Sequence, residues 1–155
     1  MREILFRGQT RRKGEKVRKD GSPVESNWVY GGVLKGNGDH SIIYQTEPDI
    51  EKKVVYTDTL GQFTGLTDKN GTKIFEGDIV EGVAYSGNFV GIIVWIDEIG
   101  GFGVRYKKRQ EATAWENSSI LKCASKGRTD EFTAEIIGNI YDNPELIRGA
   151  EDENS

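Results

Sequence analysis

The amino-acid sequence predicts a mainly β protein in which short strands alternate with tight turns. Glycine supplies 20 of the 155 residues and proline only 3. Glycine weakens helices and is favoured where a chain bends sharply, so this composition argues against a helical bundle. Short runs of β-branched and aromatic residues recur between turn-forming residues, and a sequential meander of this kind favours a small antiparallel barrel.

The N-terminal part of the chain predicts strands wherever a short apolar run interrupts polar sequence. Residues 2–6 predict an edge strand, and residues 9–26, which are polar and rich in turn formers, predict a long exposed loop. Three further strands are predicted from aromatic and β-branched residues at 28–31, 42–44 and 54–56.

Turn signals become denser in the middle of the chain. Asp68 to Gly71 predicts a hairpin loop, because Asn70 and Gly71 tolerate the positive φ angles of such turns. Gly77 and Asp78 predict a second corner, at which Asp78 accepts backbone N–H groups.

The second half continues as a meander of strands. Strands are predicted at residues 78–85 and 89–96, with a hairpin loop at 86–88 between them. A glycine pair at 100–101 then turns the chain into an antiparallel strand at 102–106. In the strand at 89–96, Ile93 and Trp95 share one face, and both faces are apolar. This pattern suggests burial on both sides or a strand that crosses between sheets.

The last third of the chain is less regular. Residues 111–124 fit a short helix or an irregular strand equally well, and residues 134–141 predict the closing strand. Asn143 is expected to cap a single helical turn whose first position is Pro144. At most one or two short helices are therefore expected.

Four separated segments resemble the YopX family, a group of small proteins encoded by bacteriophages and prophages of low-GC Gram-positive bacteria. The segments are residues 4–8, 28–31, 59–80 and 137–146, and they follow the family's order along the chain. The resemblance implies several coiled antiparallel sheets that include an SH3-like barrel. It implies no enzyme activity and no catalytic residues. The basic segment between Gly8 and Asn27 is longer than the family pattern would predict.

These observations together predict the organisation of the chain. We expect an N-terminal β-rich part over residues 1–58 with a basic loop at 9–26, an SH3-like barrel part over 59–147, and a disordered acidic tail over 148–155. Cys123 is the only cysteine and cannot form an internal disulfide, so a reducing cytoplasm, that of a bacterial host, is the expected setting. No signal peptide or membrane-spanning run is recognised, and no membrane partner is expected.

Charge is distributed unevenly in a chain of net charge −4. The first 19 residues carry eight basic and two acidic side chains. A mobile basic arm could neutralise phosphates, and a second basic cluster encloses Tyr106, on which a base could stack. The alternative for the arm is a solvated loop that keeps an edge strand from pairing with other chains, and the acidity of the whole chain favours it. The equal alternative for the second cluster is that Tyr106 is a core residue at a strand end, with the lysines in water. The candidate nucleic-acid contacts are Arg11, Arg12, Lys13, Lys16, Arg18, Lys19, Arg105, Lys107, Lys108 and Arg109.

No set of residues predicts catalysis or a cofactor. Oxygen-bearing residues from Asp68 to Glu76 have the wrong spacing for a calcium loop, since Gly71 is fourth rather than sixth. His40 is the only histidine, and nothing marks a nucleophile or further metal ligands beside it. The sequence therefore predicts a non-enzyme without metal or cofactor, in which Asp68, Asn70, Gly71, Gly77 and Asp78 form structural turns.

The last informative feature of the sequence is its number of large aromatic residues. Trp28, Tyr30, Trp95 and Trp115 are numerous for a domain of this size, and any that remain exposed would suggest a protein-binding surface. We therefore expect protein contacts, including self-association, and keep weak nucleic-acid binding as the alternative.

Overall fold

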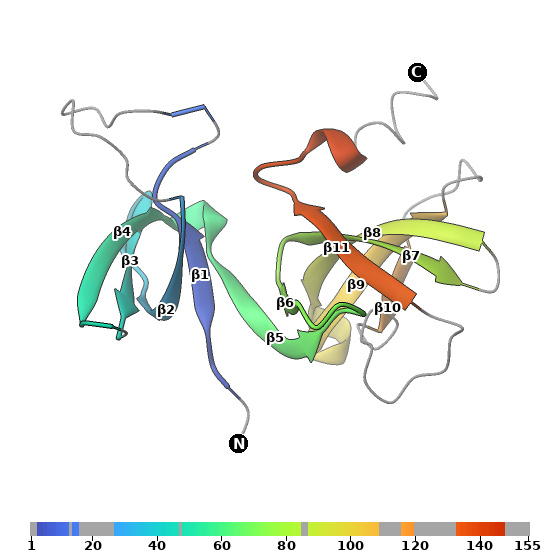
Figure 1. The fold of residues 1–155 in the computed structure, drawn as a ribbon, viewed down its shortest axis with the longest axis horizontal. Helices are drawn as coiled ribbons and strands as arrows, with labels where there is room; N and C mark the ends of the chain where they lie inside the picture. Colours follow the sequence, from blue (N-terminus) through green and yellow to red (C-terminus); the bar gives the residue numbers. More distant parts are fainter. Residues whose placement is uncertain are drawn as a thin grey trace. The chain divides into compact units, whose positions relative to one another are not determined.

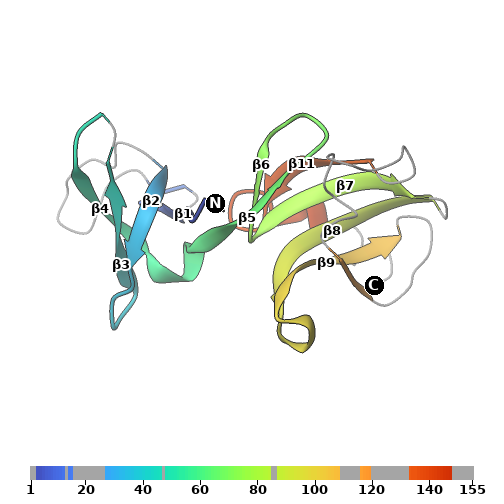
Figure 2. The same ribbon diagram turned by 90° about the horizontal axis from the view of Figure 1, so that it is seen from below.

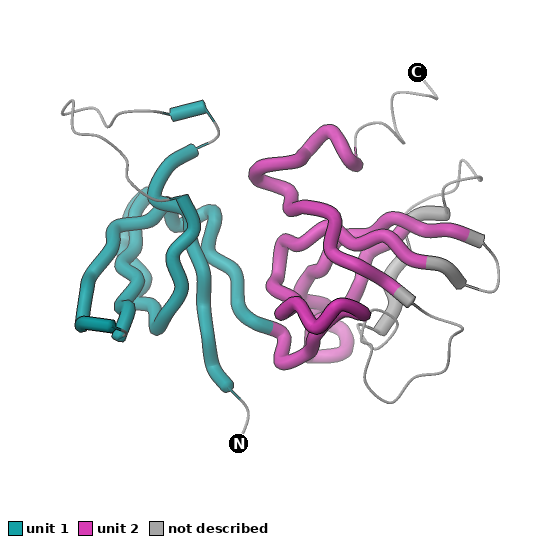
Figure 3. The backbone as a smooth tube through the Cα atoms, in the orientation of Figure 1, with its two compact units in different colours: residues 1–63 teal, residues 64–155 magenta. Residues whose placement is uncertain are grey.

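The computed structural model describes residues 3–12, 14–15, 27–46, 48–84, 87–108, 116–119 and 133–147. The chain divides into two compact units, Met1–Phe63 and Thr64–Ser155 (Figure 3). Almost all regular structure is antiparallel strand, which confirms the mainly β class (Figure 1). Within the described residues, no helix is long and apolar enough to span a membrane.

The first unit is built from strands that pair in the order β4-β3-β2-β1, with the start of β5 on the other side of β1. Their bounds are β1 Phe6–Gln9, β2 Trp28–Leu34, β3 His40–Gln45, β4 Glu51–Tyr56 and β5 Gly61–Thr67, and a 3-10 turn, η1, covers Thr57–Thr59. Val29, Ile43 and Val55 are buried on one face of this sheet and form its core.

The predicted edge strand at residues 2–6 is wrong, because β1 begins at Phe6 and pairs with both β2 and β5. Its central place requires close packing at Gly8, where an added Cβ would lie 2.8 Å from a Val55 methyl carbon. The predicted loop at 9–26 also starts too early. Gln9 belongs to β1 and is buried, and its N–H donates to Thr59 Oγ1 at 2.9 Å.

The second unit contains a five-stranded sheet in the order β10-β9-β8-β7-β11. Strands β7, β8, β9 and β11 of this sheet are labelled in Figure 2. The strands are β6 Lys73–Phe75, β7 Asp78–Ala84, β8 Gly87–Ile96, β9 Gly101–Lys108, β10 Glu116–Ser119 and β11 Thr133–Asn139, and a second 3-10 turn, η2, covers Asp97–Ile99. The core residues are Ile74, Val80, Phe89, Ile93, Val104 and Ala134. Among the described strands no pairing joins β10 to β11, so the expected closure into an SH3-like barrel is not confirmed.

The meander predicted for this half is present. β7, β8 and β9 pair antiparallel in sequence, and Gly100 turns the chain into β9 with a φ of 60°. Alternation places Trp95 on the face of the buried Ile93, yet Trp95 is 49% exposed. The Trp95 ring packs edge-on against Phe102 at 5.2 Å between ring centroids.

The segment at 111–124 includes β10, and its remaining residues lie outside those described, as do Trp115 and the tail at 148–155. A short helix occupies residues 145–147. The side chain of Asn143 acts differently from the predicted helix cap. Its Oδ1 accepts from the backbone N–H of Asn139, four residues earlier, and so closes the turn after β11.

Candidate functional site

The first unit exposes one face of the segment formed by β2, β3 and β4. Burial alternates along β2, so that Tyr30, Gly32 and Leu34 face away from the core while Val29 and Val33 pack on it. Directly paired residues of antiparallel strands share a face. We call this surface the outer face, and its members by register are Tyr30, Gly32, Leu34, His40, Ile42, Tyr44, Lys52, Val54 and Tyr56.

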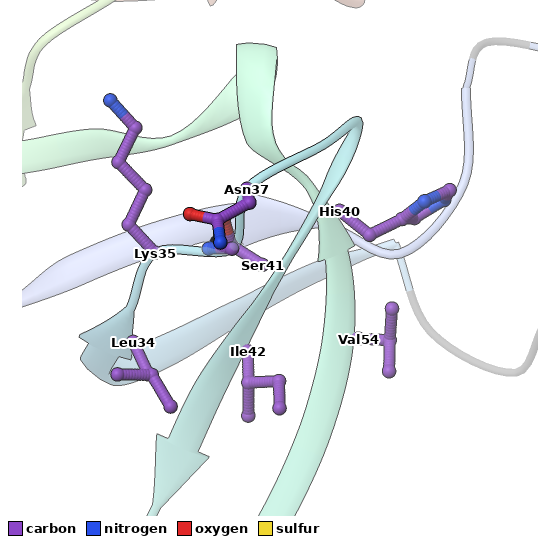
Figure 4. A pocket seen from close by; sticks show the side chains of 8 residues that line it. Leu34, Lys35, Asn37, His40, Ser41, Ile42 and Val54 are labelled. Atoms are coloured by element: carbon purple, nitrogen blue, oxygen red, sulfur yellow. Dashed lines mark hydrogen bonds between the residues drawn. The ribbon is translucent and has the colours of Figure 1, made fainter.

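An apolar row crosses the outer face. Leu34 pairs with Ile42, and Ile42 pairs with Val54, so the three aliphatic side chains lie side by side on three strands (Figure 4). Leu34 is 57% exposed and Val54 is 43% exposed. The row borders an open hollow of about 440 Å³, to which Lys35, Gly36 and Asn37 of the β2–β3 loop also contribute.

Hydrogen bonds of the Ser41 and Thr57 hydroxyl groups hold this loop in place. The N–H of Gly36 donates to Ser41 Oγ at 3.0 Å, and the same oxygen lies 2.7 Å from Thr57 Oγ1. A Cβ at Gly36 would lie 2.1 Å from the His40 carbonyl oxygen, so only glycine fits there. Ser41 is 2% exposed and its hydroxyl is engaged in these contacts. Its role in the hollow is structural.

Aromatic and charged side chains gather beyond the apolar row. The His40 ring lies 4.8 Å from the Tyr56 ring, and the Arg12 guanidinium lies 4.1 Å from the centroid of the same Tyr56 ring. Arg12 Nη1 is also 3.1 Å from an Asp58 carboxylate oxygen. The Tyr56 hydroxyl donates to Glu15 at 3.0 Å. This end of the outer face therefore combines cations with carboxylates.

The middle row of the outer face is Gly32, Tyr44 and Lys52. Lys52 Nζ lies 5.7 Å from the centroid of the Tyr44 ring, a geometry suited to cation–π attraction. Nothing lies within 4 Å of a Cβ built on Gly32. The sheet surface above Gly32 is therefore open.

The predicted nucleic-acid contacts belong to both units, and several lie outside the described residues. Arg11 and Arg12 are described in the first unit, whereas Lys13, Lys16, Arg18, Lys19 and Arg109 lie outside the described residues. In the second unit, Arg105 is an exposed residue of β9 and the backbones of Lys107 and Lys108 continue that strand. Among the predicted contacts that the structure describes, Arg12 lies against an outer-face aromatic ring, that of Tyr56.

The predicted turn residues have mainly backbone partners. Asp68 is 1% exposed, and its carboxylate accepts the N–H groups of Asn70, Thr72 and Ile136 at 2.9, 3.0 and 3.0 Å. This carboxylate therefore holds the β5–β6 loop against β11. Gly71 has a φ of 81°, as the loop requires.

The second corner is built in the same way. Asp78 is 2% exposed and accepts the Phe75 N–H at 2.7 Å. Gly77 has a φ of 92° and donates its N–H to the Ile93 carbonyl at 2.8 Å. These residues organise the backbone of the second unit. The described residues contain no group of three or more potential metal ligands.

Sequence reasoning did not identify the apolar row or Tyr44 as site residues. Ile42, Tyr44 and Val54 lie in predicted strands, whereas Leu34 lies beyond the strand predicted at 28–31, because β2 continues to Leu34. The register that aligns Leu34, Ile42 and Val54 depends on the loops between the strands, and its effect appears only once the strands are paired.

Comparisons with known proteins place the chain in a family. No curated protein matches it. Protein EF1440 from Enterococcus faecalis, known from a crystal structure, is 24% identical, with 95% of this chain and 99% of that chain covered and a TM-score of 0.48. The family model of the YopX protein matches residues 7–148. Since this match spans most of the sequence, the chain belongs to the YopX family.

Proposed function

We propose that this protein is a phage- or prophage-encoded, non-enzymatic protein of the bacterial cytoplasm that acts through protein–protein contacts made by the outer face. The exposed row of Leu34, Ile42 and Val54 carries the proposal. Burial of apolar surface against a partner is favourable by roughly 25 cal/mol per Å². Three aligned aliphatic side chains offer such surface on a rigid sheet, with aromatic residues beside them that commonly anchor interfaces.

The chemistry of the hollow supports binding rather than turnover. Its histidine, His40, packs against Tyr56, and its hydroxyl, on Ser41, is buried in the loop-holding contacts. A nucleophile would need to reach solvent and contact a base, and Ser41 is placed for neither.

Charged substitutions in the apolar row test the proposal. Leu34→Glu and Val54→Glu replace exposed side chains, so both variants are expected to fold. Ile50→Glu is the matched control, because Ile50 is 80% exposed and lies between β3 and β4 rather than on the outer face. Proteins captured from host lysate by the native chain should be lost with Leu34→Glu and retained with Ile50→Glu. A strict monomer in sedimentation that captures no protein would contradict the proposal.

One observation favours a second candidate function, weak binding of single-stranded nucleic acid. Arg12, from the predicted basic arm, lies over the Tyr56 ring beside His40. Bases stack on such rings, and cations neutralise the backbone. Asp58 and Glu15 oppose this function, because they place carboxylates at the same rings. Fluorescence anisotropy with labelled oligothymidine at low salt tests it, and binding must weaken as salt rises.

A further inference from the structure

Packing within the first unit does not require a glycine at position 32. Its neighbour Gly31 has one, because a Cβ there would lie 1.9 Å from the Tyr44 carbonyl oxygen. At Gly32 a Cβ would meet nothing within 4 Å, and the backbone φ is not positive. A side chain would therefore fit without strain. Glycine weakens a strand interior and often marks a place where a ligand approaches the backbone closely.

The backbone at Gly32 is exposed between larger side chains of the outer face. Tyr30 and Leu34 flank it along β2, and Tyr44 faces it from β3. Residues four apart on a strand are about 13 Å apart, so a planar ring has room between Tyr30 and Leu34. Tyr30 is 43% exposed and Leu34 57% exposed. The rims are aromatic and aliphatic, which suits an aromatic ring lying against the backbone. We call this feature the Gly32 slot.

The charge around the slot indicates which charge a partner should carry. None of the outward positions of β2, β3 and β4, all of which the structure describes, carries Asp or Glu, although the chain has 25 acidic residues. Lys52 belongs to the slot's own row, and Lys35 follows β2. The acidic residue of β4, Glu51, pairs in register with Gln45 and shares the opposite face with Lys53. The slot therefore complements carboxylates.

The same charge argues against a second copy of this chain as the occupant. A symmetric dimer formed through the outer face would place the same patch on both sides of the contact. Lysines near the slot would then approach each other, since the carboxylates of Glu15 and Asp58 contact Tyr56 and Arg12 on the other side of the apolar row.

We propose that the Gly32 slot binds an aromatic side chain from an acidic segment of a partner protein, with a carboxylate beside that aromatic residue pairing with Lys52. The proposal rests on the proposed function, because it assumes that the outer face makes protein contacts. The aromatic ring covers Gly32 and contacts Tyr44, while adjacent apolar residues of the partner contact the row at Leu34.

The test uses the full chain and a labelled short peptide with one phenylalanine between glutamates, and binding is followed by fluorescence anisotropy. Gly32→Val fills the slot without disturbing the fold, and about a tenfold loss of affinity is expected, which corresponds to about 1.4 kcal/mol. Lys52→Ala should weaken binding severalfold, and more at low salt than at high salt. A peptide in which alanine replaces phenylalanine should bind at least tenfold more weakly.

Two matched controls accompany these variants. Gly38→Val places a side chain into open space in the β2–β3 loop, and Lys53→Ala removes a cation from β4 on the opposite face. Both should retain the affinity of the native chain. Equal losses in the Gly32 and Gly38 variants, or in the Lys52 and Lys53 variants, would overturn the proposal.

The remaining outcomes separate this inference from the proposed function. If a captured protein is lost with Leu34→Glu but retained with Gly32→Val, the outer face makes protein contacts and the slot assignment is overturned. If no protein or peptide binds, both the proposed function and the slot assignment are contradicted. If oligothymidine binds in place of the peptide and Gly32→Val abolishes that binding, the slot recognises bases and the acidic protein partner is refuted.

Discussion

Asp68→Ala should destabilise the second unit much more than an ordinary loop substitution. The carboxylate accepts three backbone N–H groups, from Asn70, Thr72 and Ile136, and is almost wholly buried. An unsatisfied buried donor costs about 1–3 kcal/mol. Asn70 and Thr72 are exposed, so water can replace part of the hydrogen bonding that their N–H groups lose. Ile136 is half-buried, so its N–H is less accessible to water. We expect a loss of about 3 kcal/mol in the free energy of unfolding.

Asp68→Asn separates the two roles of this carboxylate. The amide keeps one acceptor oxygen, which can still serve Asn70 and Thr72 within the loop. Its NH₂ group would then face the Ile136 N–H, so two donors would oppose each other. The expected cost is about 1–2 kcal/mol, with hydrogen exchange at Ile136 accelerated more than exchange at Thr72.

Urea unfolding followed by NMR provides the measurement. Cross-peaks of Ile93 and Val104 report the second unit, and those of Ile43 in the first unit serve as an internal control. Asn70→Ala is the matched variant, because its side chain makes an exposed contact with Glu135, and it should change stability by less than about 0.5 kcal/mol. The reasoning is refuted if Asp68→Ala costs no more than Asn70→Ala.

Three other substitutions test the backbone and packing arguments. Gly77→Ala forces a side chain onto a φ of 92° and should cost about 1–3 kcal/mol by thermal unfolding; an unchanged melting temperature would show that this corner is relaxed. Thr59→Val removes the buried acceptor of the Gln9 N–H and should cost about 1–2 kcal/mol, with faster exchange of that amide. Gly91→Ala places a Cβ 2.6 Å from a Val104 methyl carbon and should cost about 1–3 kcal/mol, partly recovered when Val104 is shortened to alanine.

The sequence predicted the features that depend on near neighbours. The β7–β8–β9 meander and the turn at Gly100 follow from glycine and polar residues within a few positions, although β8 begins at Gly87, inside the loop predicted at 86–88. The central position of β1 was not predicted, because residues 2–6 have the length and composition of an edge strand. Pairing with β5 is a long-range event that a local pattern does not encode.

The candidate site was harder to predict for a related reason. Charge drew attention to the two basic clusters, since runs of lysine and arginine are visible in any sequence. The outer face has no such signal, because each of its strands contributes only one residue to the apolar row. Gly32 and Gly31 are adjacent and identical in type, and only the position of the Tyr44 carbonyl distinguishes their roles.

The pairing of β7 with β11 has a consequence for synthesis of the chain. β8 follows β7 directly, but residues Thr133–Asn139 are translated long after both. Until they leave the ribosome, one side of β7 presents unpaired amide and carbonyl groups to other nascent chains. Premature stop codons before position 133 should therefore yield aggregating products rather than a shorter folded protein.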